Sequence, residues 1–205
     1  MDQLFAVEMP KYLENLNLPD PVLLSLYKNY EKRIIWMDSK VDEMYIEYAK
    51  KIVEWNAEDK GKAQEDRVPI KLFVFSPGGD LDVNNLLVDV IRLSKTKVVT
   101  INFGIALSAG AFIYLAGHER LALPGSTFLF HSGSADNISG TADQIAAFND
   151  QYKKQVKRLK DYLIEMGLPK KMVDTKMRGE WFFNAQEAVE LGVCHRVIES
   201  LDEVL

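Results

Sequence analysis

The sequence predicts an α/β fold built on a mainly parallel sheet. Apolar runs rich in β-branched and aromatic residues alternate with helix-patterned segments between residues 70 and 131. Strands that alternate with helices form parallel βαβ units, whose sheets are covered on both faces. At 205 residues the chain is long enough for one sizeable core, so a single domain over residues 1–205 is expected.

The first third of the chain predicts an arm, a strand and a helix. Residues 1–30 are interrupted by three prolines and are expected to form an irregular arm with a short helix. Residues 33–37 predict a strand, and residues 41–55 predict a helix because their apolar side chains recur at helical spacing. The highly charged residues 57–67 predict a solvated loop without chemistry.

The middle of the chain carries the clearest alternation of strands and helices. Its predicted elements are a strand over 70–75, a turn over 76–79, a helix over 81–94, a strand over 97–103, a helix over 108–116, and short strands over 120–123 and 127–131. Each helix thus connects two strands, as a parallel sheet requires.

The last third begins with a polar loop over 136–140 and then predicts one long helix. Residues 141–166 are amphipathic, with Thr141 as a cap and Gly167 as a stop. A strand over 181–183, a short helix over 185–191 and a strand over 193–198 follow.

Composition excludes several classes of function. A formal charge of −5 argues against a nucleic-acid-binding surface, and the single cysteine cannot form an intrachain disulfide, which fits a reducing cytoplasm. The N-terminus lacks the basic start and apolar core of a signal peptide. Residues 98–117 carry no charge, but Asn102, Ser108 and three glycines indicate a buried strand leading into a helix, not a membrane span.

Two strand–turn–helix junctions carry candidate chemistry. The turn Ser76-Pro77-Gly78-Gly79 can expose backbone N–H groups, although by itself it is an ordinary turn. Ser108 lies at a helix start, where unpaired N–H groups and the helix dipole favour a nearby oxyanion. The alternative is that Ser108 is only a helix cap.

A histidine follows the last strand of the middle region. His131 lies at the carboxyl end of that strand, the edge where ligands bind in open α/β sheets. The other two histidines, His118 and His195, lie in less suggestive positions.

Residues 31–200 resemble the Clp protease proteolytic subunit (ClpP) family. Four segments match in the family's order: the turn 76–79, the serine segment 104–112, the segment 123–131 that ends in the histidine, and the helix and turn 185–192. The resemblance implies a ClpP/crotonase-like βαβ superhelix with a mainly parallel sheet and a protruding helical handle, here residues 132–167. It also implies a serine endopeptidase that needs no cofactor and no metal.

The resemblance assigns roles to individual residues. It implies Ser108 as nucleophile and His131 as general base, with the N–H groups of Gly79 and Ala109 as the oxyanion hole and Gly78 in the same substrate-binding turn.

The third triad member departs from the family pattern. The family's aspartate lies just before an aromatic-rich strand, where this chain has Glu180, and Asp174 is the alternative. A carboxylate at either place can hold the histidine tautomer. Ser132-Gly133 replaces the family's usual Gln-Pro, and Ala109 replaces its usual Met.

The resemblance also implies partners. It implies peptide or unfolded-protein substrates, a homo-oligomer of heptameric or tetradecameric rings, and an AAA+ ATPase partner. The arm over residues 1–30 matches the family poorly, which leaves docking of that ATPase open.

Three other functions remain open. Glu180 and the altered flank of His131 would suit a catalytically silent ring scaffold or regulator. The segment around Ser108 approaches the nucleophile elbow of an α/β-hydrolase with His195 as base, although Ala106 replaces its first glycine. A crotonase-like acyl-CoA enzyme shares the architecture, but a serine–histidine pair favours a peptidase.

Overall fold

The computed structural model describes residues 20–134 and 138–204, which fall into two compact units. The first unit ends at Lys32 and contains helix α1 (Pro21–Glu31). The Asp20 carboxylate caps this helix by accepting the Val22 N–H at 2.8 Å, which confirms the short helix predicted for the arm. The rest of that arm, residues 1–19, lies outside the described residues, as do residues 135–137 of the polar loop.

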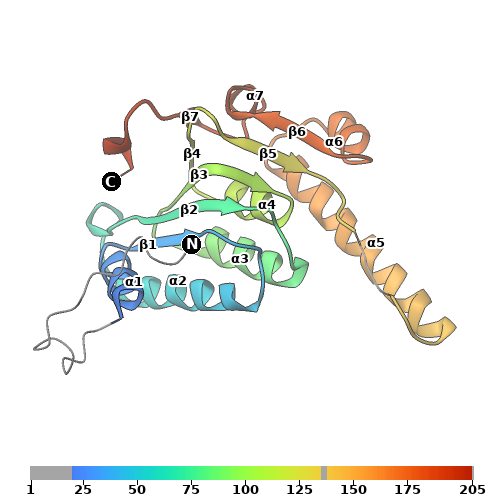
Figure 1. Ribbon diagram of the computed structural model, residues 1–205, viewed down its shortest axis with the longest axis horizontal. Helices are drawn as coiled ribbons and strands as arrows, with labels where there is room; N and C mark the ends of the chain where they lie inside the picture. Colours follow the sequence, from blue (N-terminus) through green and yellow to red (C-terminus); the bar gives the residue numbers. More distant parts are fainter. Residues whose placement is uncertain (1–19, 135–137, 205) are drawn as a thin grey trace, which may run out of the picture. The chain divides into compact units, whose positions relative to one another are not determined.

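The second unit, from Arg33 onward, contains a seven-stranded, mainly parallel sheet (Figure 1). Its strands are β1 (Ile34–Met37), β2 (Ile70–Ser76), β3 (Val98–Leu107), β4 (Glu119–Ala122), β5 (Thr127–Phe130), β6 (Trp181–Asn184) and β7 (Arg196–Val197). The order β1-β2-β3-β4-β7 is parallel throughout. β5 pairs parallel with the end of β3, and β6 pairs antiparallel with β5. The predicted fold class is therefore confirmed.

Six α-helices accompany the sheet among the described residues of this unit. They are α2 (Ile46–Glu58), α3 (Leu81–Leu93), α4 (Ala109–Leu115), α5 (Ala142–Glu165), α6 (Lys170–Lys176) and α7 (Ala185–Glu190). α3 packs against both α2 and α4, and α4 also contacts β2 and β3. Figure 1 shows α2 and α3 beneath β1 and β2.

The opposite face of the sheet carries a second apolar cluster. Its buried members come from four neighbouring strands and from the C-terminal segment: Ile34, Phe73, Val99, Ile101, Leu121, Ile198 and Val204. The end of the chain thus helps to cover the face that the βα helices leave open.

Two predictions between residues 41 and 67 are only partly confirmed. The predicted helix begins only at Ile46, because Val41 forms a parallel bridge with Gly79. Val41 is fully buried beside this bridge. Its apolar side chain therefore fits the helical spacing of the residues that follow, although Val41 is not in the helix. The predicted solvated loop contains the end of α2 and Asp59, which is fully buried.

Other boundaries also differ from the prediction. β3 continues to Leu107, four residues beyond its expected end, because its last part pairs with β5. β7 is reduced to residues 196–197, since only these pair with β4. α6 was not expected, because its seven residues are largely charged and polar and give little periodicity.

A buried ion pair explains why Asp59 lies inside. Arg33 has a positive φ of 55°, and its guanidinium donates two hydrogen bonds to Asp59, at 2.5 and 3.0 Å. The Thr96 hydroxyl donates a further bond to the same carboxylate at 2.7 Å. The hydrogen bond from Arg33 holds the pKa of Asp59 well below its ordinary value.

We expect Asp59→Asn to lower the free energy of unfolding by about 3–5 kcal/mol, because it removes the buried counter-ion of Arg33 and leaves only the half-exposed Glu58 beside the buried guanidinium. Glu58→Gln is the matched control. Glu58 pairs with the same guanidinium but is half exposed, so its loss should cost less than about 1 kcal/mol. Urea unfolding at pH 7 measures both. Because the pKa of Asp59 is lowered on folding, its contribution should be complete above about pH 4 and fall as the pH drops further.

Helix α5 extends away from the strands, as expected for a handle (Figure 1). Thr141 and Gln144 form a capping box at its start, as the sequence predicts for Thr141. Only Leu159, Tyr162 and Leu163, near its end, are buried. No helix of the described residues is long and apolar enough to cross a membrane.

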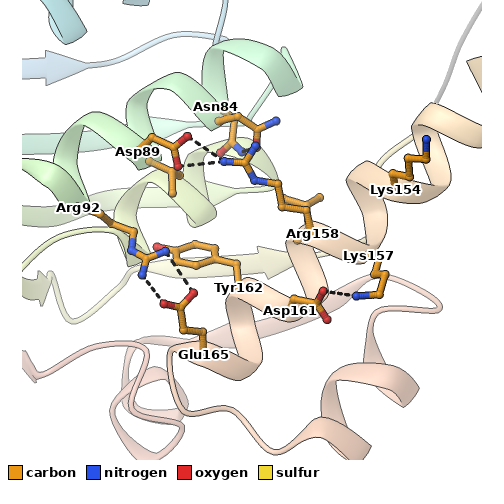
Figure 2. A pocket seen from close by; sticks show the side chains of 12 residues that line it. Asn84, Asp89, Arg92, Lys154, Lys157, Arg158, Asp161, Tyr162 and Glu165 are labelled. Atoms are coloured by element: carbon orange, nitrogen blue, oxygen red, sulfur yellow. Dashed lines mark hydrogen bonds and ion pairs between the residues drawn. The ribbon is translucent and has the colours of Figure 1, made fainter.

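Ion pairs hold the C-terminal half of α5 against α3 (Figure 2). Arg158 bonds Asp89 at 2.8 Å, and Arg92 bonds Glu165 at 2.5 Å. A pocket of about 300 Å³ lies between the two helices. Exposed pairs of this kind contribute little stability each, so the buried apolar residues anchor the helix.

Candidate active site

Ser108 occupies the tight turn between β3 and α4. Its φ of 51° and ψ of −125° lie outside the regions that a non-glycine residue ordinarily adopts. The Ser108 N–H donates to the Leu129 carbonyl at 2.9 Å, which ties the turn to β5. The serine side chain makes no capping hydrogen bond to its helix, so Ser108 is not an ordinary helix cap.

Gly78 packs directly against this turn. A Cβ on Gly78 would lie 2.6 Å from the Ser108 Cβ and 2.7 Å from the Leu107 oxygen, which only glycine avoids. The Gly78 N–H donates to the Ser76 hydroxyl at 3.2 Å. Gly78 therefore supports the serine turn and has no free N–H.

His131 reaches Ser108 from the adjacent strand. β3 and β5 run parallel with Leu107 opposite Leu129, so both strands end at the same edge of the sheet. His131 Nε2 lies 2.6 Å from Ser108 Oγ, a hydrogen-bonding distance. The pair has the geometry of a nucleophile and its base.

Glu180 reaches the other nitrogen of the imidazole. The antiparallel β5–β6 pairing ends with Phe130 opposite Trp181, so the next residues outward are His131 and Glu180. Cross-strand neighbours of this kind share one face of the sheet. His131 Nδ1 lies 3.1 Å from Glu180 Oε1, although the Glu180 side chain is 59% exposed.

The alternative acid and base lie elsewhere. Asp174 on α6 accepts a hydrogen bond from Lys170 at 3.0 Å, which lowers the pKa of Asp174. His195 Nδ1 accepts the Arg120 backbone N–H at 3.1 Å, and burial lowers its pKa. His118 likewise accepts a backbone N–H, from Val98 at 2.9 Å. The structure thus brings His131 and Glu180 to the serine, and neither Asp174 nor His195.

Among the described residues, the glycine turn leaves one backbone N–H, that of Gly79, without an acceptor. The Val41 N–H donates to Gly78 O at 2.9 Å, and the Asp80 N–H donates to Val41 O at 2.8 Å, so Val41 occupies one edge of this turn. A Cβ on Gly79 would lie 2.2 Å from Val41 O. Within residues 20–134 and 138–204 no acceptor meets the N–H of Gly79 or of Ala109, which leaves both available to a ligand.

A cavity of about 1070 Å³ opens over these groups. Gly79, Ser108, Ala109 and His131 line this cavity, and so do Tyr152 and Leu159 of α5. The contribution of α5 to the site had no signal in the sequence, because Tyr152 and Leu159 look like members of an amphipathic stripe. The described residues include no group of His, Cys, Asp or Glu that could hold a metal ion.

Comparison with known proteins identifies relatives of the chain. The model of the Clp protease family matches residues 23–201. The ATP-dependent Clp protease proteolytic subunit 2 of Pseudomonas aeruginosa is 33% identical over 143 residues, which cover 66% of this chain and 69% of that protein. The protein of the same name in Corynebacterium diphtheriae is 28% identical over 198 residues, covering 95% of this chain and 94% of its own. A solved ClpP1 mutant from Listeria monocytogenes superposes with a TM-score of 0.74 at 20% identity, over 88% of this chain and 99% of its own.

Proposed function

The chain belongs to the Clp protease family, and we propose on that premise that it is a serine endopeptidase with Ser108 as nucleophile, His131 as general base and Glu180 as the residue that orients the base. The observation that carries the proposal is the continuous hydrogen-bonded series from Ser108 Oγ through His131 to Glu180, at 2.6 and 3.1 Å. This series has the roles and order of a serine triad.

In the proposed reaction Ser108 Oγ attacks the scissile carbonyl while His131 Nε2 accepts the serine proton. The N–H groups of Gly79 and Ala109 would hold the oxyanion, and both lie on the cavity beside Ser108. His131 then gives its proton to the leaving amine. Water hydrolyses the acyl-enzyme with His131 again as base, which restores the free serine.

An extended peptide is the proposed substrate form. Because Val41 pairs with one edge of the glycine turn, the opposite edge of Gly79 offers its N–H and C=O. A peptide could pair with that edge as an added strand. This supports peptides and unfolded proteins as substrates, since a folded chain cannot present an extended backbone.

We also propose that the subunits form rings and that α5 joins two rings. The first half of α5 leaves Ile145 and Phe148 more than 40% exposed, and apolar surface of this kind is commonly covered by a partner. The relatives are named as proteolytic subunits of ATP-dependent proteases, which supports a homo-oligomer and an ATPase partner of the AAA+ class. The single cysteine, Cys194, is buried and free, which fits the expected cytoplasmic location.

A fluorophosphonate probe tests the proposal. We expect the purified wild type to form an adduct on Ser108, identified by mass spectrometry of its peptides, and to hydrolyse a short fluorogenic peptide. His131→Ala should lower the labelling rate by about 10³-fold or more, whereas His195→Ala should leave it within about twofold. Ring assembly without any Ser108 adduct would instead favour a silent scaffold.

A further inference from the structure

His131 and Glu180 both lie beyond the last pair of the β5–β6 ladder. The ladder ends at Phe130 and Trp181, so the backbone pairing of the two strands does not include His131 or Glu180. The Glu180 side chain is 59% exposed, and water competes for its carboxylate. Something other than the ladder must keep the two side chains together at this end.

Ser132 makes the next connection between the two chain segments. Its hydroxyl donates to the Met177 carbonyl at 2.7 Å, which joins the loop after β5 to the turn before β6. Met177 is a firm anchor, because its side chain is 1% exposed and its N–H bonds the last turn of α6. His131 and Glu180 therefore lie between the end of the ladder on one side and this hydrogen bond on the other.

A second hydrogen bond holds the same residue from α5. The Tyr152 hydroxyl donates to the Ser132 carbonyl at 3.0 Å. The side chain of Ser132 thus bonds Met177, and its backbone carbonyl bonds Tyr152. Both hydrogen bonds are partly buried. Neither bond touches the reacting atoms.

We propose that Ser132 is a positioning residue, whose hydroxyl holds His131 in register with Glu180. This inference rests on the proposed peptidase function. Without the hydroxyl, the loop after β5 would be free to move away from the Met177 turn. The imidazole would then lose its fixed orientation toward the serine, and small misplacements of a base are costly in rate.

Ser132→Ala is the direct test, with Ser132→Thr as the rescuing variant. Ser126→Ala is the matched control, because the Ser126 hydroxyl also donates to a backbone carbonyl, that of Asn102 at 2.8 Å, at the other end of β5. We expect Ser132→Ala to lower kcat and the rate of fluorophosphonate labelling of Ser108 by about 10- to 100-fold, with KM within about twofold. Ser132→Thr should recover most of the rate, and Ser126→Ala should keep it while lowering the unfolding temperature.

Three results would overturn the inference while leaving the peptidase in place: labelling of Ser132→Ala at the wild-type rate, no recovery in Ser132→Thr, or an equal loss in Ser126→Ala. An absence of Ser108 labelling in the wild type would overturn the proposed function, and the inference with it. The wild-type measurement therefore separates the two failures.

If Ser132→Ala does not fold, Tyr152→Phe is the second variant that tests the same connection. It removes only the second bond to Ser132 and keeps the ring, so a loss of about 3- to 10-fold in kcat is expected. Its control is Tyr162→Phe on the same helix, whose buried hydroxyl has no hydrogen-bond partner among the described residues. Equal rates for the Tyr152 and Tyr162 variants would contradict a role for this connection.

Discussion

Ser108→Ala is expected to lower kcat by roughly 10⁶-fold, to the level that binding and the oxyanion donors alone sustain. The alanine removes the atom that lies 2.6 Å from His131 Nε2, and no other hydroxyl lies at hydrogen-bonding distance from that nitrogen among the described residues. The oligomeric state should be the same as that of the wild type, because the variant loses one oxygen and keeps the backbone. Hydrolysis of a fluorogenic peptide, with sizing by light scattering, measures both properties.

Ser126→Ala is the control for this experiment as well. It deletes a buried hydroxyl just before β5 that donates to the Asn102 carbonyl, and it should retain full turnover. If Ser108→Ala kept more than about a hundredth of the wild-type kcat, a different nucleophile would be required and the triad would be wrong.

Glu180→Ala should give the second largest loss, about 10⁴-fold in kcat with little change in KM. The reason is that His131 Nδ1 loses its 3.1 Å partner, so neither the tautomer nor the ring orientation is fixed. Glu180→Asp should recover part of the rate, because a shorter carboxylate reaches the imidazole less well. Steady-state kinetics at saturating peptide measure these differences.

Asp174→Ala is the matched control for the acid. Asp174 pairs with Lys170 and, at 4.0 Å, with Lys160, so its loss should leave kcat within about twofold. Impairment of Asp174→Ala together with full activity of Glu180→Ala would reverse the assignment. A loss of under tenfold in Glu180→Ala would mean that the exposed carboxylate contributes little.

The sequence predicted the parts of the site that depend on strand ends. Ser108 and His131 could be expected at one edge because each follows an apolar strand, and parallel strands end together. Glu180 could be predicted only from the family resemblance. Its place opposite His131 depends on the antiparallel pairing of β5 with β6, which are separated in sequence by α5 and α6. No local pattern encodes that register.

The two residues whose environment the sequence pattern did not predict share a physical cause. Val41 and Asp59 are both fully buried by partners distant in the chain, Gly79 and Arg33. Periodicity and charge report the average environment of a residue type, and a specific long-range partner overrides it. The connections of Ser132 to Met177 and Tyr152 belong to the same class.

The long segment between β5 and β6 has a consequence for how such a chain can evolve. α5 and α6 both lie between His131 and Glu180 in sequence, yet these two residues are neighbours because β5 and β6 pair directly. The outer part of α5 can therefore change in length and surface while the β5–β6 register, together with the Ser132–Met177 hydrogen bond just beyond it, keeps the base and the acid together. With the assembly proposed above, selection on assembly and selection on chemistry would act on separate parts of one chain, and in the described residues these parts meet where Tyr152 and Leu159 line the cavity.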